Sequence, residues 1–133
     1  MKKISSGLTI LEVIVSVLIA GFVLVGMLHL YSLGAIASNL SRHKLMALNI
    51  AQAEVESLIN TSYASINLSN YPKVQTVKID TGKTGNAGDD INGAMTTNIS
   101  PITEGYKVIV TVSWTDYYGA MNEVLESTIT SYL

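Results

Sequence analysis

The chain has 133 residues with 8 basic and 10 acidic side chains, and it contains no cysteine. This length corresponds to one domain, and the absence of clustered lysine and arginine argues against direct nucleic-acid binding. The lack of cysteine excludes a disulfide framework and an acylated lipoprotein anchor. Hydrophobic residues make up 48% of the chain and are concentrated in the first 33 residues, so we expect one domain plus a membrane anchor.

The longest apolar run covers Leu8–Leu33, which contains no proline and a single formal charge, at Glu12. At about 1.5 Å per residue, these 26 residues form about 39 Å of helix, which is enough to cross a bilayer. Lys2 and Lys3 precede the run, whereas the next basic residue is Arg42. Because basic flanks stay on the cytoplasmic side, this asymmetry predicts a single-pass segment with a cytoplasmic N-terminus.

Glu12 is the feature that an ordinary anchor does not explain. A carboxylate within a membrane span costs about 2.5–3.5 kcal/mol on insertion scales, and such a residue usually has a partner. Two other interpretations of the run remain open. One is a single-pass anchor in which Glu12 has no role. The other is a secretory signal peptide that ends at Ala35–Ala37, although the run is longer than the apolar region of such peptides.

The residues at the start of the run resemble the processing site of type IV prepilins and pseudopilins. A short basic leader ends in Gly7, and the sequence Leu-Thr-Ile-Leu-Glu-Val follows from Leu8 to Val13. The family usually has Phe after the glycine and Leu-Ile before the glutamate, so Leu8 and the order Ile10-Leu11 depart from its pattern. The resemblance divides the chain into a leader (1–7), a transmembrane and assembly segment (8–33), and an amphipathic helix half with a β-rich head (34–133).

The resemblance also implies a processing and assembly pathway. In the family, a prepilin peptidase cleaves after the residue that matches Gly7, and the new amino group, here on Leu8, is N-methylated. The matching glutamate, here Glu12, is expected to pair with the N-terminal amine of a neighbouring subunit. The implied partners are other pilin or pseudopilin subunits, the peptidase and an inner-membrane assembly platform. The implied location is the bacterial inner membrane, followed by an extracytoplasmic filament.

Beyond Leu33 the sequence predicts a continuing, amphipathic helix. Apolar residues recur at steps of three and four, and polar residues occupy the positions between them. Asn60, Ser62 and Pro72 are stop signals, so we expect a helix from about residue 8 to about residue 60. The residues expected on the apolar face are Ile36, Leu40, Ala47, Ile50, Ala51, Val55 and Leu58, and those expected to face away from it are Asn39, Arg42, Lys44, Asn49, Gln52 and Glu56.

The second half of the chain has the alternation that is typical of strands. Tyr106–Thr115 is the clearest strand, Val74–Ile79 is a shorter one, and Glu123–Leu133 is rich in β-formers. We expect Asp116–Asn122 to connect the last two as a hairpin. A long helix packed on a small antiparallel sheet, an α+β fold, is the economical arrangement. It is also the pilin-like head that the resemblance implies.

The stretch Asp80–Gly105 is low in hydrophobic residues, and we expect a mobile surface loop there. Gly82–Thr84 superficially matches a phosphate-binding loop but lacks the glycine five residues earlier. Asp89, Asp90 and Asn92 leave calcium binding open, although the complete EF-hand spacing is missing.

No catalytic set is apparent in the sequence. His29 lies in the apolar run, His43 lies on the predicted helix, and there is no cysteine, so we expect neither an enzyme nor a cofactor site. Residues 47–58 followed by Tyr63, together with the Tyr106–Thr115 hairpin, resemble V-type minor pilins, the pilus-modification proteins.

We therefore expect a structural minor pilin that acts in the tip or initiation complex of a type IV pilus. An I-type minor pseudopilin of a type II secretion or DNA-uptake system remains an alternative. From a different class, a single-pass membrane-tethered binding domain also remains open.

Overall fold

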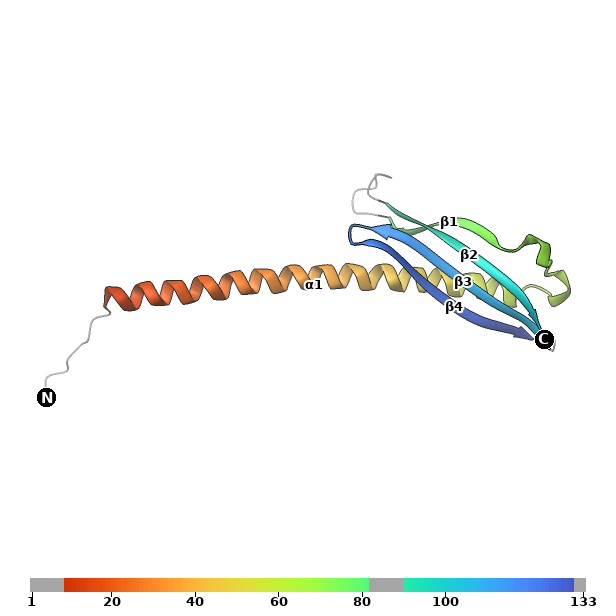
Figure 1. Cartoon of the computed structure of the whole chain (residues 1–133), viewed down its shortest axis with the longest axis horizontal. Helices are drawn as coiled ribbons and strands as arrows, with labels where there is room; N and C mark the ends of the chain where they lie inside the picture. The colour runs from red at the N-terminus through yellow and green to blue at the C-terminus, as the bar shows by residue number, and fades with distance from the viewer. Residues whose placement is uncertain (1–8, 82–89, 131–133) are drawn as a thin grey trace. The chain divides into compact units, whose positions relative to one another are not determined.

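The structure is a computed structural model that describes residues 9–81 and 90–130. One long helix, α1 (Ile10–Ile59), is followed by two short 3₁₀ helices, η1 (Tyr63–Ser65) and η2 (Leu68–Asn70). Four strands follow, β1 (Lys73–Asp80), β2 (Ile91–Ile102), β3 (Gly105–Asp116) and β4 (Gly119–Thr130) (Figure 1). The chain separates into two units, one ending at Asn39 and the other, which we call the head, beginning at Leu40.

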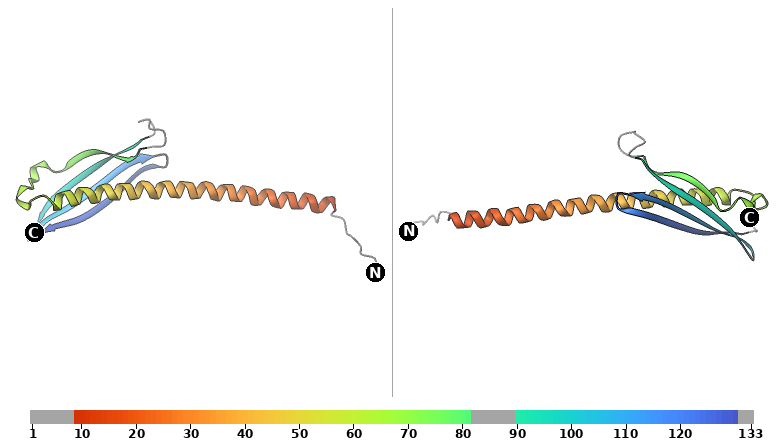
Figure 2. Two further views of the ribbon diagram at one scale, coloured as in Figure 1. Left: turned by 180° about the vertical axis from the view of Figure 1, so that it is seen from behind. Right: turned by 45° about the horizontal axis from the view of Figure 1, so that its top comes forward.

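The four strands form one antiparallel sheet in the order β1-β2-β3-β4, so each strand pairs with its neighbour in sequence. Two-residue turns connect β2 to β3 and β3 to β4, because the last pairs before the turns are Ile102 with Gly105 and Asp116 with Gly119. Gly119 has a φ of +119°, a backbone conformation that side-chain-bearing residues rarely adopt. Residues 40–59 of α1 lie across one face of the sheet (Figure 2).

The core of the head forms where α1 meets the sheet. On β3, alternate residues from Val108 to Trp114 are buried, as a strand with one covered face requires. Two alanines, Ala47 and Ala51, are fully buried on α1, and their small side chains allow the sheet to approach the helix backbone closely. The buried apolar residues are Ala47, Ala51, Val55, Leu58, Ile66, Ile79, Met95, Val108, Val110, Val112, Trp114 and Ile129.

The structure confirms the α+β layout, with a long helix packed against an antiparallel sheet. It also confirms the two faces predicted for the amphipathic part of α1. All seven residues expected on the apolar face are buried or half-buried, and all six expected on the polar face are exposed. The helix ends at Ile59, one residue before the predicted limit.

The prediction of a surface loop over Asp80–Gly105 is wrong for residues 91–102, which form the central strand β2. The inward positions of β2 include Gly93 and Thr97, so the strand lacks the continuous apolar alternation that marks β3. Pairing with β1 on one side and β3 on the other holds β2 in the sheet. Tertiary pairing therefore overrides a weak local preference. Residues 82–89 of the predicted loop lie outside the described residues.

The predicted hairpin connection Asp116–Asn122 is also too long. The β3–β4 ladder continues to the pair of Asp116 with Gly119, so the turn itself contains only Tyr117 and Tyr118. The strand β4 begins four residues earlier than expected, at Gly119, and is described to Thr130. Within β1, the structure adds one residue to each end of the predicted strand Val74–Ile79.

Candidate functional site

The predicted assembly residue Glu12 lies in the first turn of α1, and Thr9 caps that turn. The Thr9 Oγ1 accepts a hydrogen bond from the Glu12 backbone N–H at 3.3 Å. Thr9 therefore acts as the N-cap of α1. The negative charge of Glu12 in the first turn interacts favourably with the helix dipole.

The side chain of Glu12 has no partner among residues 9–81 and 90–130, where its carboxylate forms neither a hydrogen bond nor an ion pair. The other predicted site residues, Gly7 and Leu8, lie outside the described residues. The structure therefore places Glu12 at the helix N-terminus and does not address the cleavage and methylation site.

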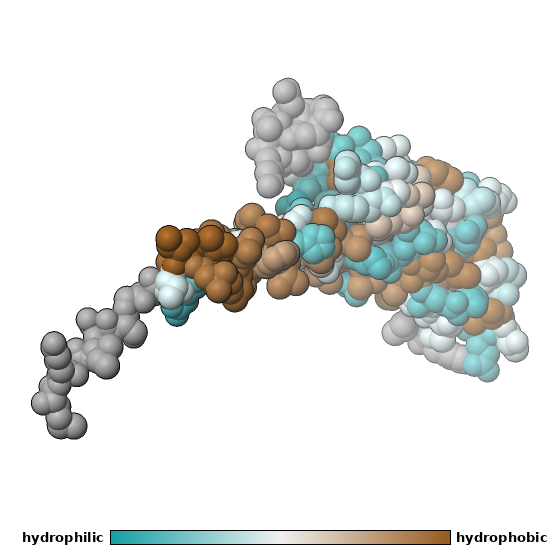
Figure 3. Space-filling model, turned by 60° about the vertical axis from the view of Figure 1, so that its left-hand side comes forward, coloured by the Kyte–Doolittle hydropathy of each residue, from teal (hydrophilic) through white to brown (hydrophobic). Residues whose placement is uncertain are grey.

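The helix surface that follows Glu12 is apolar on the face seen in Figure 3, and the large apolar side chains from Val13 to Leu33 are exposed. None of the most apolar part of α1 is buried, and by length and composition the helix is able to cross a membrane. Phe22 is 79% exposed. Soluble proteins rarely expose an apolar surface of this extent, and the surface is compatible with a helix that spans a membrane.

A shallow hollow of about 340 Å³ interrupts the apolar surface at Gly21. It is lined by Val17, Leu18, Phe22 and Val25. Apart from the adjacent residues and the backbone of the same helix turn, no atom of the described chain lies within 4 Å of the position that a Cβ of Gly21 would occupy, so packing within the chain does not require glycine there. Small residues on membrane helices allow a second helix to approach closely.

A charged cluster that the sequence analysis missed surrounds His43 in the head. The His43 Nδ1 lies 3.4 Å from the Asp116 Oδ2, and the Nε2 lies 3.3 Å from the Asp80 Oδ2. Arg42 also pairs with Asp80. His43 is buried, and the side chain of Asp116 is only 2% exposed. We call these four residues the His43 cluster.

Local structure holds the two carboxylates in place. The Asp116 Oδ1 accepts a hydrogen bond from the Tyr118 backbone N–H at 2.7 Å, so the β3–β4 turn fixes the orientation of this side chain. Asp80 is the last residue of β1, where the register with β2 shifts after Lys78. The cluster therefore joins α1 to the ends of two strands.

One sequence signal does point to His43. It precedes Ala47 and Ala51 by four and eight residues, so it occupies the same inward face of the helix. A histidine at such a position is buried and needs polar partners, but nothing near it in the sequence identifies Asp80 and Asp116.

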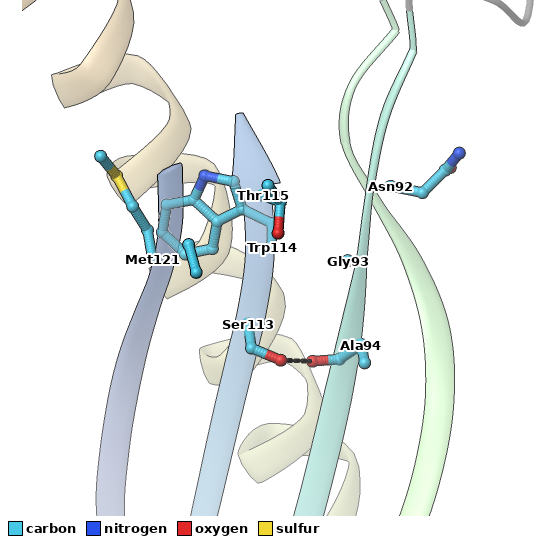
Figure 4. A pocket seen from close by; sticks show the side chains of 8 residues that line it. Asn92, Gly93, Ala94, Ser113, Trp114, Thr115 and Met121 are labelled. Atoms are coloured by element: carbon cyan, nitrogen blue, oxygen red, sulfur yellow. Dashed lines mark hydrogen bonds between the residues drawn. The ribbon is translucent and has the colours of Figure 1, made fainter. Parts of the chain in front are cut away.

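A second hollow, of about 460 Å³, lies on the sheet where β2, β3 and β4 adjoin (Figure 4). The Ser113 hydroxyl donates to the Ala94 carbonyl oxygen at 3.3 Å in this hollow. Its lining offers hydrogen-bonding groups but no acid or base, so it lacks the groups that acid–base chemistry requires. The lining residues are Asn92, Gly93, Ala94, Ser113, Trp114, Thr115, Ala120 and Met121.

The proposed calcium ligands are only partly described. Asp89 lies outside the described residues, and Asp90 pairs with Lys78 at 2.7 Å. Asn92 belongs to β2. In the part of the chain that the structure describes, no group of three or more His, Cys, Asp or Glu side chains is arranged to hold a metal ion.

Comparison of the chain with protein-family models, with curated proteins and with solved structures gives no match.

Proposed function

We propose that the chain is a structural, non-enzymatic subunit of a type IV pilus or a pilus-like filament, and that it acts as a minor subunit in the tip or initiation complex. The observation that carries the proposal is the combination of an exposed apolar segment, residues 10–35 of α1, with one carboxylate in the first turn of the helix. An anchor needs only the apolar surface. A subunit that assembles through this helix needs the carboxylate as well.

The electrostatics of Glu12 support an assembly role. A carboxylate in a bilayer is costly without a partner, and the described residues supply none. The free amino group of a processed N-terminus has an ordinary pKa of about 8 and is mostly protonated at neutral pH. Docking two subunits supplies the ammonium of one to the Glu12 carboxylate of the other, so each charge gains a partner that it lacks alone.

The head has the features of a structural unit. Its core is filled by apolar side chains from α1 and the sheet, and its charged residues are mostly engaged in ion pairs between elements. The apolar surface of α1 remains uncovered within the described chain. In the proposed filament, the corresponding helices of neighbouring subunits cover this surface, and the hollow at Gly21 gives one of them room to approach.

Substituting Glu12 tests the proposal directly. Glu12→Leu should ease membrane insertion by about 2.5–3.5 kcal/mol while reducing incorporation into filaments, because the N-terminal amine of the neighbour loses its partner. Fractionation of cells into inner membrane and sheared filaments measures both effects. Val13→Leu, a neutral change at the next position, is the matched control. If Glu12→Leu enters filaments as well as Val13→Leu does, Glu12 is not an assembly residue, and the membrane-tethered binding domain becomes the better explanation.

Processing provides a second, independent test. We expect cleavage between Gly7 and Leu8, and Gly7→Leu should retain the leader, because a bulky residue does not fit where the family has a small one. Mass spectrometry of the purified chain identifies the N-terminus. Ser6→Ala is the control and should be cleaved normally. A methylated Leu8 supports the filament subunit, whereas an intact Met1 in the unsubstituted chain supports the tether.

A further inference from the structure

The position of His43 between two carboxylates determines which protonation state of the ring fits the site. Carboxylates accept hydrogen bonds, and a neutral imidazole has one donor nitrogen and one acceptor nitrogen. Asp116 faces Nδ1 and Asp80 faces Nε2. A neutral ring would therefore direct a lone pair at one of the two carboxylates. Only the doubly protonated ring can donate to both.

The charge balance of the His43 cluster leads to the same conclusion. With the ring protonated, the charges of Arg42 and His43 equal those of Asp80 and Asp116. With the ring neutral, the cluster carries one excess negative charge. Because the side chain of Asp116 is almost completely buried, water cannot compensate for the lost partner, and an unpaired buried charge is costly.

The other charged groups near the cluster do not restore this balance. On α1, Lys44 pairs with Glu123 of β4 at 3.6 Å, so this pair contributes no net charge. Strand β2 contains no titratable side chain, and Asp90, which precedes it, pairs with Lys78. Proton loss from His43 is therefore not offset by an unpaired base among the described residues of these elements.

We propose that His43 is a proton-dependent clasp between α1 and the sheet. In the protonated state the ring holds the ends of β1 and β3 against the helix. When the ring loses a proton as the pH rises, the two carboxylates lose a shared partner, and this end of the head loosens. Histidine is the side chain whose charge usually changes between about pH 5 and 8. The inference concerns the head alone and is independent of an assembly role for Glu12.

The test measures thermal unfolding of the full chain in detergent micelles, followed by fluorescence. The chain has a single tryptophan, Trp114, which is buried on β3 two residues before Asp116, so its emission reports on the relevant end of the head. Between about pH 6 and about pH 9 the Tm of the wild type should fall by about 4–8 °C. In His43→Gln the Tm should be lower at the acidic end and should vary little over the same interval.

His29 provides the matched control, since it is the other histidine in the chain and lies in the exposed apolar part of α1. His29→Gln should retain the wild-type pH dependence. A wild-type Tm that does not fall as the pH rises would overturn the proposal, as would an equal fall in His43→Gln.

Two further measurements keep the proposal testable if His43→Gln does not fold. Asp116→Asn replaces a carboxylate with a group that can donate to a neutral ring, and it should reduce the fall in Tm with rising pH. In the ¹⁵N NMR spectrum of the wild type, both ring nitrogens of His43 should be protonated at about pH 6. A neutral tautomer at that pH, or an unchanged pH dependence in Asp116→Asn, would contradict the clasp.

Discussion

The parts of α1 before and after Asn39 differ in whether their hydrophobic side chains are buried. Residues 10–35 are almost entirely apolar, and every one of them is exposed. From His43 to Leu58, by contrast, every third or fourth residue is buried, and the buried set includes a histidine and two alanines. The most hydrophobic part of the chain is therefore the least buried, and the part that forms the core of the head is only moderately hydrophobic.

This difference shows that one continuous helix has two separate sources of stability. Isolated helices are marginal in water, and most helical stability in proteins comes from the packing of one face. In residues 40–59 that packing comes from the sheet. The exposed part has no such packing within the residues that the structure describes. Substitutions in the two parts should therefore affect different measurements.

The largest effect on the head should follow Trp114→Ala. Trp114 is 3% exposed and shares the core with Ala47 and Val55 of α1. Removing the indole should lower the free energy of unfolding by about 3–5 kcal/mol, since it removes a large buried side chain and leaves a cavity. Urea unfolding of the full chain in detergent, followed by far-UV circular dichroism, measures this change. Tyr117→Ala, at a residue that is 94% exposed on the adjacent turn, should leave the midpoint almost unchanged.

Two leucine substitutions, one in each part of α1, test directly which part contributes to the stability of the head. Leu58 is 7% exposed, so Leu58→Ala should lower the free energy of unfolding of the head by about 2–5 kcal/mol. Leu24 is 61% exposed, so Leu24→Ala should change it by no more than about 0.5 kcal/mol. The same urea titration compares the two variants. Equal losses would mean that the apolar part of α1 contributes to the stability of the head, and the separation into two units would be incorrect.

The elements that the sequence predicted correctly are those with strong local periodicity. The inward face of α1 follows from apolar residues at three- and four-residue steps, and β3 follows from the alternation between Tyr106 and Trp114. In both cases the residue types alone distinguish the covered face from the exposed one. The long apolar run predicted a helix through its length and its lack of proline, and α1 begins at Ile10, two residues after the expected start.

The features that the sequence did not predict depend on residues that are distant along the chain. Strand β2 exists because β1 and β3 pair with it, although its own residues are mostly small or polar. His43 meets Asp80 and Asp116 across separations of 37 and 73 residues. No local pattern encodes such contacts. The roles of Gly7 and Leu8 remain predictions that rest on the resemblance to prepilins.

A smaller effect should follow removal of one buried hydroxyl from the helix–sheet contact. Thr97 of β2 is fully buried, and its Oγ1 donates to the Glu54 Oε1 of α1 at 3.4 Å. Thr97→Val preserves the shape and removes the donor, so it should lower the free energy of unfolding by about 1 kcal/mol. Thr96→Val, at the next residue on the opposite face of β2, is the control and should change it by less than about 0.5 kcal/mol. If Thr97→Val and Thr96→Val have the same free energy of unfolding, the hydrogen bond from Thr97 to Glu54 does not contribute to the stability of the head.

The smallest effect concerns the contact between Tyr63 and Tyr106, whose rings stack with centroids 4.6 Å apart. Burial raises the pKa of the Tyr63 hydroxyl above its ordinary value of 10.0, and the hydrogen bond with Tyr106 and the repulsion from it act in the same direction. The folded head therefore favours the neutral phenol. The stability that comes from a neutral Tyr63 hydroxyl is complete below the unfolded-state pKa of about 10. It is lost as the pH rises through the folded-state pKa.

The Tm of the wild type should consequently fall more steeply above about pH 10 than that of Tyr63→Phe, which has no hydroxyl to titrate. Tyr117→Phe, at a fully solvated position, should follow the wild type. If Tyr63→Phe and the wild type give parallel curves, the stacked pair does not contribute to the alkaline stability of the head.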